Sequence, residues 1–128
     1  MDALEVSKPI EDFLNFLRDC EQQYHIAEAE EQEANNQTQD ILHSLELEPH
    51  NYHEYARLSK ELVTVRQNRR TAKDTMDMIA PVLRWKSDNR TCINSMEQLL
   101  GIVRKAEKRI ENRIYMPRSK KRGENDDM

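Results

Sequence analysis

The sequence predicts an all-α fold of three long antiparallel helices, arranged as a helical hairpin or coiled-coil-like bundle. The chain has 128 residues with two glycines; 5% of the residues are aromatic and 34% are charged. Sandwiches and barrels need many tight turns and many β-branched or aromatic residues, so all-β and doubly wound α/β folds are excluded. Apolar residues instead recur at alternating steps of three and four, which is the spacing of one helix face.

The first helix is predicted over residues 8–47. Ser7 is a candidate N-cap, and Pro9 falls in the first turn, where proline is tolerated. The helix is expected to end just before Pro49, because the residue that precedes a proline disfavours the α conformation. Its inward-facing row mixes apolar and polar residues. The row consists of Ile10, Leu14, Leu17, Cys20 or Glu21, Tyr24, Ala27, Glu31, Ala34, Thr38, Ile41 and Leu45.

The second helix is predicted over residues 51–86. Asn51 and Glu54 match a variant of the capping box, in which each side chain bonds to the backbone of the other residue. Arg69 occupies a position of the apolar row where a hydrophobic residue is expected. Pro81 lacks a backbone donor, so a kink or a broken last turn is expected there.

The third helix is predicted over residues 89–115, with Asn89 or a neighbour as its N-cap. Gly101 in its interior costs about 1 kcal/mol relative to alanine, which predicts a close approach between helices at that point. Trp85, at the end of the second helix, is expected either to cover the end of the bundle or, if exposed, to act as a binding hot spot.

One helical domain is predicted over residues 1–117, followed by a disordered, charged tail at residues 118–128. The apolar rows are narrow and the mean hydropathy is −0.97, so the core of a monomer is thin. A homo-oligomer, with a dimer favoured, is therefore expected. In an up-down-up bundle the first and third helices run parallel, which would bring Cys20 and Cys92 to similar heights. Both thiols are expected to be reduced and buried.

No segment of the sequence predicts membrane insertion or secretion. The N-terminus lacks the basic and apolar regions of a signal peptide. The longest uninterrupted apolar run is three residues, far below the ~20 that a membrane span needs. A soluble, cytoplasmic protein is expected.

Charge is distributed unevenly along the chain. Residues 1–50 contain 13 acidic and two basic residues, whereas residues 51–128 contain 11 acidic and 18 basic residues. The acidic candidates for partner binding are Glu21, Glu28, Glu30, Glu31 and Glu33. The basic candidates for nucleic-acid binding are Arg66, Arg69, Arg70, Lys73, Arg104, Lys105, Lys108 and Arg109.

Three interpretations of this asymmetry stay open. The acidic and basic helices pair with each other within the bundle or across a dimer, where exposed pairs contribute about 0–1 kcal/mol each. Alternatively, unpaired carboxylates imitate a row of phosphates and occupy the basic groove of a nucleic-acid-binding protein. In the third interpretation the basic residues bind nucleic acid themselves, although aromatic residues that could stack on bases are nearly absent among them.

No catalytic, cofactor or metal motif stands out. The sequence has no glycine-rich phosphate loop, G-x-S-x-G, H-E-x-x-H or CxxC pair. His50 and His53 flank the turn before the second helix, and a zinc site there would need further ligands from His43, Glu46 or Glu54. Exposed turn histidines are the preferred interpretation. The chain is therefore expected not to be an enzyme and to bind no cofactor or metal.

The stretches Cys20–Glu28, Thr38–Leu47 and Arg104–Arg118 together resemble a family of small helical proteins encoded by phages and integrative elements of Firmicutes. The resemblance covers about residues 10–118. It implies a mobile-element protein in a bacterial cytoplasm and carries over no active site. Small phage proteins often bind host machinery, including CRISPR and other defence nucleases.

The predicted function is a non-enzymatic helical protein that acts through protein–protein contacts. In its most specific form it is an anti-CRISPR-like inhibitor, whose acidic helix competes with nucleic acid for a host defence protein. One alternative is a nucleic-acid-binding accessory protein of phage replication or recombination. The other is a self-assembling coiled-coil scaffold with no outside partner.

Overall fold

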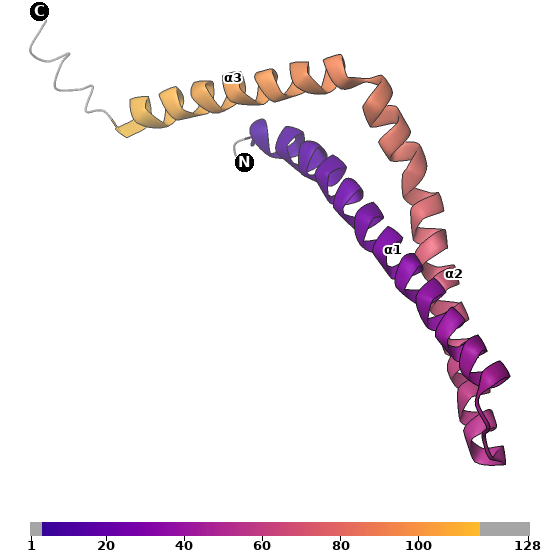
Figure 1. The fold of residues 1–128 in the computed structure, drawn as a ribbon. Helices are drawn as coiled ribbons and strands as arrows, with labels where there is room; N and C mark the ends of the chain where they lie inside the picture. Colours follow the sequence, from indigo (N-terminus) through magenta and orange to yellow (C-terminus); the bar gives the residue numbers. More distant parts are fainter. Residues whose placement is uncertain (1–3, 116–128) are drawn as a thin grey trace, which may run out of the picture. The chain divides into compact units, whose positions relative to one another are not determined.

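The structure, a computed structural model, describes residues 4–115 and confirms the all-α fold (Figure 1). It contains α1 (Ser7–Leu47), α2 (Tyr52–Asp88) and α3 (Arg90–Tyr115), and no strand occurs in the described part. Each boundary lies within two residues of its prediction. The tail predicted at residues 118–128 lies outside the described residues.

Contacts along the chain group into two compact units. Among the described residues, the first unit combines residues 4–15 with residues 89–115, so it contains the start of α1 and all of α3. The second unit, residues 16–88, is a hairpin made of the rest of α1 and all of α2. In Figure 1 these two long helices lie side by side.

The core of the hairpin follows a seven-residue repeat on both helices, the pattern of a coiled coil. Ion pairs of Glu21 with Lys86 and of Glu31 with Arg69 show that α1 and α2 are antiparallel, as predicted. Small residues occupy several core positions, which lets two helices pack closely. The buried residues of the repeat are Cys20, Ala27, Ala34 and Ile41 on α1, and Leu58, Val65, Ala72 and Ile79 on α2.

The turn of the hairpin is closed by the predicted capping box. Asn51 Oδ1 accepts a 2.9 Å hydrogen bond from the backbone N–H of Glu54, and Glu54 Oε1 accepts a 3.0 Å bond from that of Asn51. His50 packs edge-on against Tyr55, and its Nε2 lies 2.9 Å from the carbonyl oxygen of Ser44. Its side chain is 10% exposed, so the interpretation of His50 as an exposed turn residue is wrong. This histidine instead covers the last carbonyl groups of α1.

In the other unit, α3 runs antiparallel to the first turns of α1. The backbone N–H of Ser7 bonds to Glu107, and Glu11 pairs with Arg104. The up-down-up order, in which α3 would run parallel to α1, is therefore wrong. A reversal between packed helices usually takes about 2–8 residues, whereas Asn89 alone separates α2 from α3.

Three further expectations are met in part or not at all. α2 is continuous through Pro81, which excludes the broken last turn, while the alternative of a kink stays a prediction. A Cβ added to Gly101 would meet no atom within 4 Å, so the predicted close approach is wrong. Cys20 is buried but Cys92 is exposed, and both are free cysteines; Cys92 lies one heptad before the exposed Leu99, on the same side of α3.

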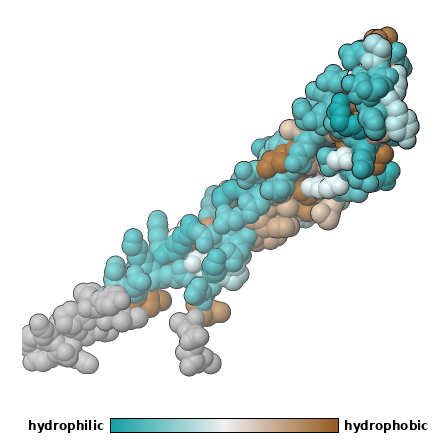
Figure 2. Space-filling model, turned by 90° about the horizontal axis from the view of Figure 1, so that it is seen from below, coloured by the Kyte–Doolittle hydropathy of each residue, from teal (hydrophilic) through white to brown (hydrophobic). Residues whose placement is uncertain are grey.

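Most of the face drawn in Figure 2 is hydrophilic, with hydrophobic side chains gathered in separate patches. This agrees with the low mean hydropathy of the chain. Large apolar side chains that remain exposed occur on all three helices, among them Ile26, Val63 and Ile102.

Candidate functional site

Two of the five acidic candidates form ion pairs with basic side chains of α2. Lys86 Nζ donates a 2.7 Å hydrogen bond to Glu21 Oε1, and this bond lowers the pKa of the Glu21 carboxyl below its usual value. Glu31 Oε2 lies 3.9 Å from a guanidinium nitrogen of Arg69. These contacts fit the interpretation in which the acidic and basic helices pair with each other.

The other three carboxylates are spread around α1. Glu28 Oε1 lies 3.5 Å from Nδ1 of His25, and Glu33 accepts a 3.2 Å hydrogen bond from Gln37. Glu30 and Glu33 line a shallow groove between α1 and α2. Because each helical residue advances by about 100°, Glu30 lies on nearly the opposite side of α1 from Glu28. The five acidic candidates therefore do not share one face.

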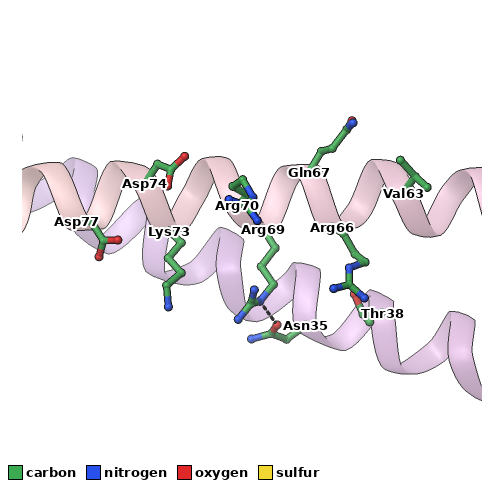
Figure 3. Close-up of a pocket in the computed structure, with 10 residues that line it drawn as sticks. All are labelled: Asn35, Thr38, Val63, Arg66, Gln67, Arg69, Arg70, Lys73, Asp74 and Asp77. Atoms are coloured by element: carbon green, nitrogen blue, oxygen red, sulfur yellow. Dashed lines mark hydrogen bonds between the residues drawn. The ribbon is translucent and has the colours of Figure 1, made fainter.

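The four basic candidates of α2 are brought together. They line an open groove of about 870 Å³ beside α1, drawn in Figure 3. Arg69 Nε donates a 2.9 Å hydrogen bond to Asn35 Oδ1. No acidic side chain in residues 4–115 forms an ion pair with Arg66, Arg70 or Lys73. The residues lining the groove are Asn35, Thr38, Val63, Arg66, Gln67, Arg69, Arg70, Lys73, Asp74 and Asp77.

The basic candidates of α3 are separated by role. Arg104 forms an ion pair with Glu11 across the α1–α3 contact and so helps to hold the first unit together. Lys105, Lys108 and Arg109 are exposed on α3. Arg104 is also exposed but is engaged by Glu11, whereas no ion pair within residues 4–115 involves Lys105, Lys108 or Arg109.

A row of exposed apolar side chains on α3 was not among the predicted candidates. Leu99, Ile102 and Ile110 are 46%, 65% and 55% exposed, and at about 100° per residue they fall on one side of the helix. We call these three residues the α3 apolar row. The signal was present in the sequence, because the apolar residues Leu99, Leu100, Ile102 and Val103 follow one another so closely that they cover more than one side of a helix.

Glu107 is a second residue that sequence patterns missed. Its carboxylate accepts a 3.0 Å hydrogen bond from the backbone N–H of Ser7, the first residue of α1. The hydrogen bonds from the side chain and the backbone of Ser7 lower the pKa of the Glu107 carboxyl below its usual value, because they stabilise its charged form. No local pattern links two residues that are 100 positions apart.

Within residues 4–115, no three His, Cys, Asp or Glu side chains are grouped so that they could hold a metal ion. Trp85 is 42% exposed, at the end of α2 in the hairpin unit. None of the helices in this part of the chain combines the length and the apolarity that crossing a bilayer requires.

Comparisons with protein-family models, with curated proteins and with solved structures found no match for this chain.

Proposed function

We propose that the chain is a non-enzymatic helical binding protein that acts through protein–protein contact, and that a helix of the partner docks on α3. The observation that carries this proposal is the exposure of the α3 apolar row, Leu99, Ile102 and Ile110. Full burial of an aliphatic side chain of this size contributes about 1.5–3 kcal/mol. Three such side chains supply the apolar centre that a binding interface needs.

The first turn of α1 does not reach the end of α3 and leaves Ile110 uncovered, whereas Leu99 and Ile102 lie before this point on α3 and are exposed all the same. The hydrogen bond between Ser7 and Glu107 lies at the start of α1, while α3 continues to Tyr115. Ile110 therefore lies beyond the stretch of α3 that the first turn of α1 reaches. A partner helix that lays its own apolar face along α3 would bury all three residues of the row.

The charges beside the row indicate the chemistry of the partner. Lys105 and Arg109 are exposed and lie four residues apart on one flank of the row. An interface selects partners of complementary potential and rejects like charges. The partner helix is therefore expected to carry acidic residues beside its apolar face. The resemblance to phage and mobile-element proteins supports a host protein as the partner.

The positions of the acidic residues support docking of a partner on α3 rather than an inhibitor whose acidic helix competes with nucleic acid. Pairing of Glu21 with Lys86 and of Glu31 with Arg69 leaves Glu28, Glu30 and Glu33 to imitate phosphates. Since these three are spread around α1, they form no continuous row. An inhibitor that binds its target through α3 needs no such row.

A homodimer stays a prediction, but the α3 apolar row is poorly suited to form it. A two-fold interface brings the same surface patch of each copy together. If two copies of α3 paired antiparallel on this row, Lys105 and Arg109 of one copy would lie beside the same basic side chains of the other, which is unfavourable. Light scattering of the purified chain measures whether it self-associates, and the same measurement on Ile102→Glu/Ile110→Glu shows whether the α3 apolar row is involved.

The experiment compares two double variants in a tagged pull-down from a nuclease-treated Firmicutes lysate. Ile102→Glu/Ile110→Glu alters the α3 apolar row. Val63→Glu/Met78→Glu makes the same chemical change at two exposed apolar residues of the hairpin. Circular dichroism checks that both variants keep the helicity of the wild type.

The proposal requires that one protein is captured by the wild type and by the hairpin control, and that its recovery falls at least tenfold with the α3 variant. Reconstitution with that protein in purified form then tests direct contact. Equal capture by all three chains, or a set of proteins that disappears with nuclease treatment, would contradict docking on α3.

A further inference from the structure

The groove of the hairpin contains basic side chains that the fold leaves unused. Arg69 is held by Asn35 and Glu31. Arg66, Arg70 and Lys73 form no ion pair with any side chain in residues 4–115. Figure 3 shows Arg66 and Lys73 extending from α2 toward α1, on the same side as Arg69. Arg66, Arg70 and Lys73 are therefore available to a ligand.

Their spacing matches a chain of negative charges. Arg66 and Lys73 are seven residues apart, which is about 10 Å along a helix axis, and Arg70 lies between them. One strand of DNA carries a phosphate about every 3.4 Å of helix axis. The three side chains thus span about three phosphate spacings. An arginine can hold a phosphate through two parallel hydrogen bonds, and a lysine acts as a point charge.

The rest of the lining indicates that bases would not be read. No aromatic residue is among the ten that line the groove, so bases would find no stacking surface. Asn35 and Gln67 supply neutral hydrogen-bonding groups. Asp74 and Asp77 oppose a negative ligand, and Figure 3 shows Asp74 on the far side of α2 while Asp77 extends on the same side as Lys73.

We propose that this groove binds a chain of phosphates through Arg66, Arg70 and Lys73. The ligand is either the backbone of a nucleic acid, contacted without regard to base sequence, or a free polyphosphate. This site lies on the hairpin unit and the α3 apolar row on the other unit, so the phosphate site does not depend on the proposed docking of a protein. Failure of one leaves the other standing.

The test is a titration of the full chain with three probes: a labelled single-stranded oligonucleotide, the matching duplex and inorganic triphosphate. Each is repeated at several salt concentrations. Three phosphate contacts predict a slope of log affinity against log salt of about −2 for the single strand and about −2.7 for the duplex. Whichever probe binds identifies the source of the phosphates.

Matched variants separate the groove from general charge. Arg66→Gln/Arg70→Gln/Lys73→Gln removes three positive charges from the groove. Arg57→Gln/Lys60→Gln/Arg84→Gln removes three from exposed positions of α2 outside it. The groove variant is expected to bind at least tenfold more weakly and to lose the salt slope, while the control binds within about twofold of the wild type. Asp77→Asn is expected to bind about twofold more tightly, because one repulsive charge is removed.

Three results would overturn the proposal. The first is binding of none of the probes at about 100 μM protein, the weak end of non-specific affinity. The second is equal weakening by the groove variant and its control. The third is equally tight binding of a poly-glutamate peptide, which would show a preference for negative charge without preference for phosphate.

Discussion

The carboxylate of Glu107 accepts a 3.0 Å hydrogen bond from the backbone N–H of Ser7, a residue 100 positions earlier in the chain. The first N–H groups of a helix have no partner within the helix. In most helices a side chain just before the first turn satisfies one of them. In this protein a residue of α3 does so for α1, and the contact ties the two segments of the first unit together.

Replacing this carboxylate is expected to destabilise the first unit. Glu107→Gln removes the negative charge from the N-terminus of α1 while keeping the size of the side chain. The midpoint of thermal unfolding, followed by circular dichroism, is expected to fall by a few degrees. Glu111→Gln, at an exposed position of the same helix, is the control. Equal midpoints for the two variants would show that the Ser7–Glu107 contact contributes nothing to stability.

Stability is expected to fall in acid because two carboxyl groups have lowered pKa values. The hydrogen bond from Lys86 lowers the pKa of Glu21, and the hydrogen bond from Ser7 lowers that of Glu107. A carboxyl whose pKa is lower in the folded state stabilises the fold above its unfolded pKa. That contribution disappears as the pH falls through the folded pKa.

The measurement is the thermal midpoint of wild type and Glu21→Gln/Glu107→Gln at a series of values between about pH 6 and pH 3. The double variant is expected to start from a lower midpoint at pH 6 and to lose less stability on acidification. An identical acid-induced drop in both proteins would assign the pH dependence to other groups.

Gly101→Ala is expected to stabilise the protein by about 0.5–1 kcal/mol. The added methyl group would meet nothing within 4 Å, and alanine loses less backbone entropy than glycine when a helix forms. Denaturant unfolding at equilibrium measures the change. A decrease in stability would reveal a close contact at this position that involves another molecule, such as a second copy of the chain.

Reversing the charge of Glu28, Glu30 and Glu33 to lysine tests phosphate mimicry by α1. These three carboxylates form no ion pair with α2, so helicity should be retained. If the partner docks on the α3 apolar row, the captured protein is recovered within about twofold of the wild-type amount. Loss of capture by this variant would instead favour the inhibitor that competes with nucleic acid through its acidic helix.

Local sequence patterns predicted most of the secondary structure. The three-four spacing located the helices, and the Asn51–Glu54 pair marked the start of α2 because both of its hydrogen bonds lie within one turn. Arg69 stood out as a charged residue in an apolar row, and in the structure it bonds to Asn35 across the hairpin. Such features depend on neighbouring residues, so they can be recognised in the sequence.

The remaining features depend on residues that are distant in the sequence. The pairing of Glu21 with Lys86 spans 65 positions, and nothing in either segment selects the other among many acidic and basic residues. The antiparallel course of α3 relative to α1 follows from its contacts with Ser7 and Glu11. Because the sequence does not reveal this direction, it could not predict that Cys92 and the α3 apolar row are exposed.

Site-specific photo-cross-linking in cells tests docking on α3 most directly. A photoreactive phenylalanine analogue is placed at Ile102 in one chain and at Val63, an exposed residue of the hairpin, in another. Docking on α3 predicts one cross-linked protein at position 102 that is absent at position 63. Cross-linking only to a second copy of the chain, equal products at both positions, or no product at position 102 would contradict it.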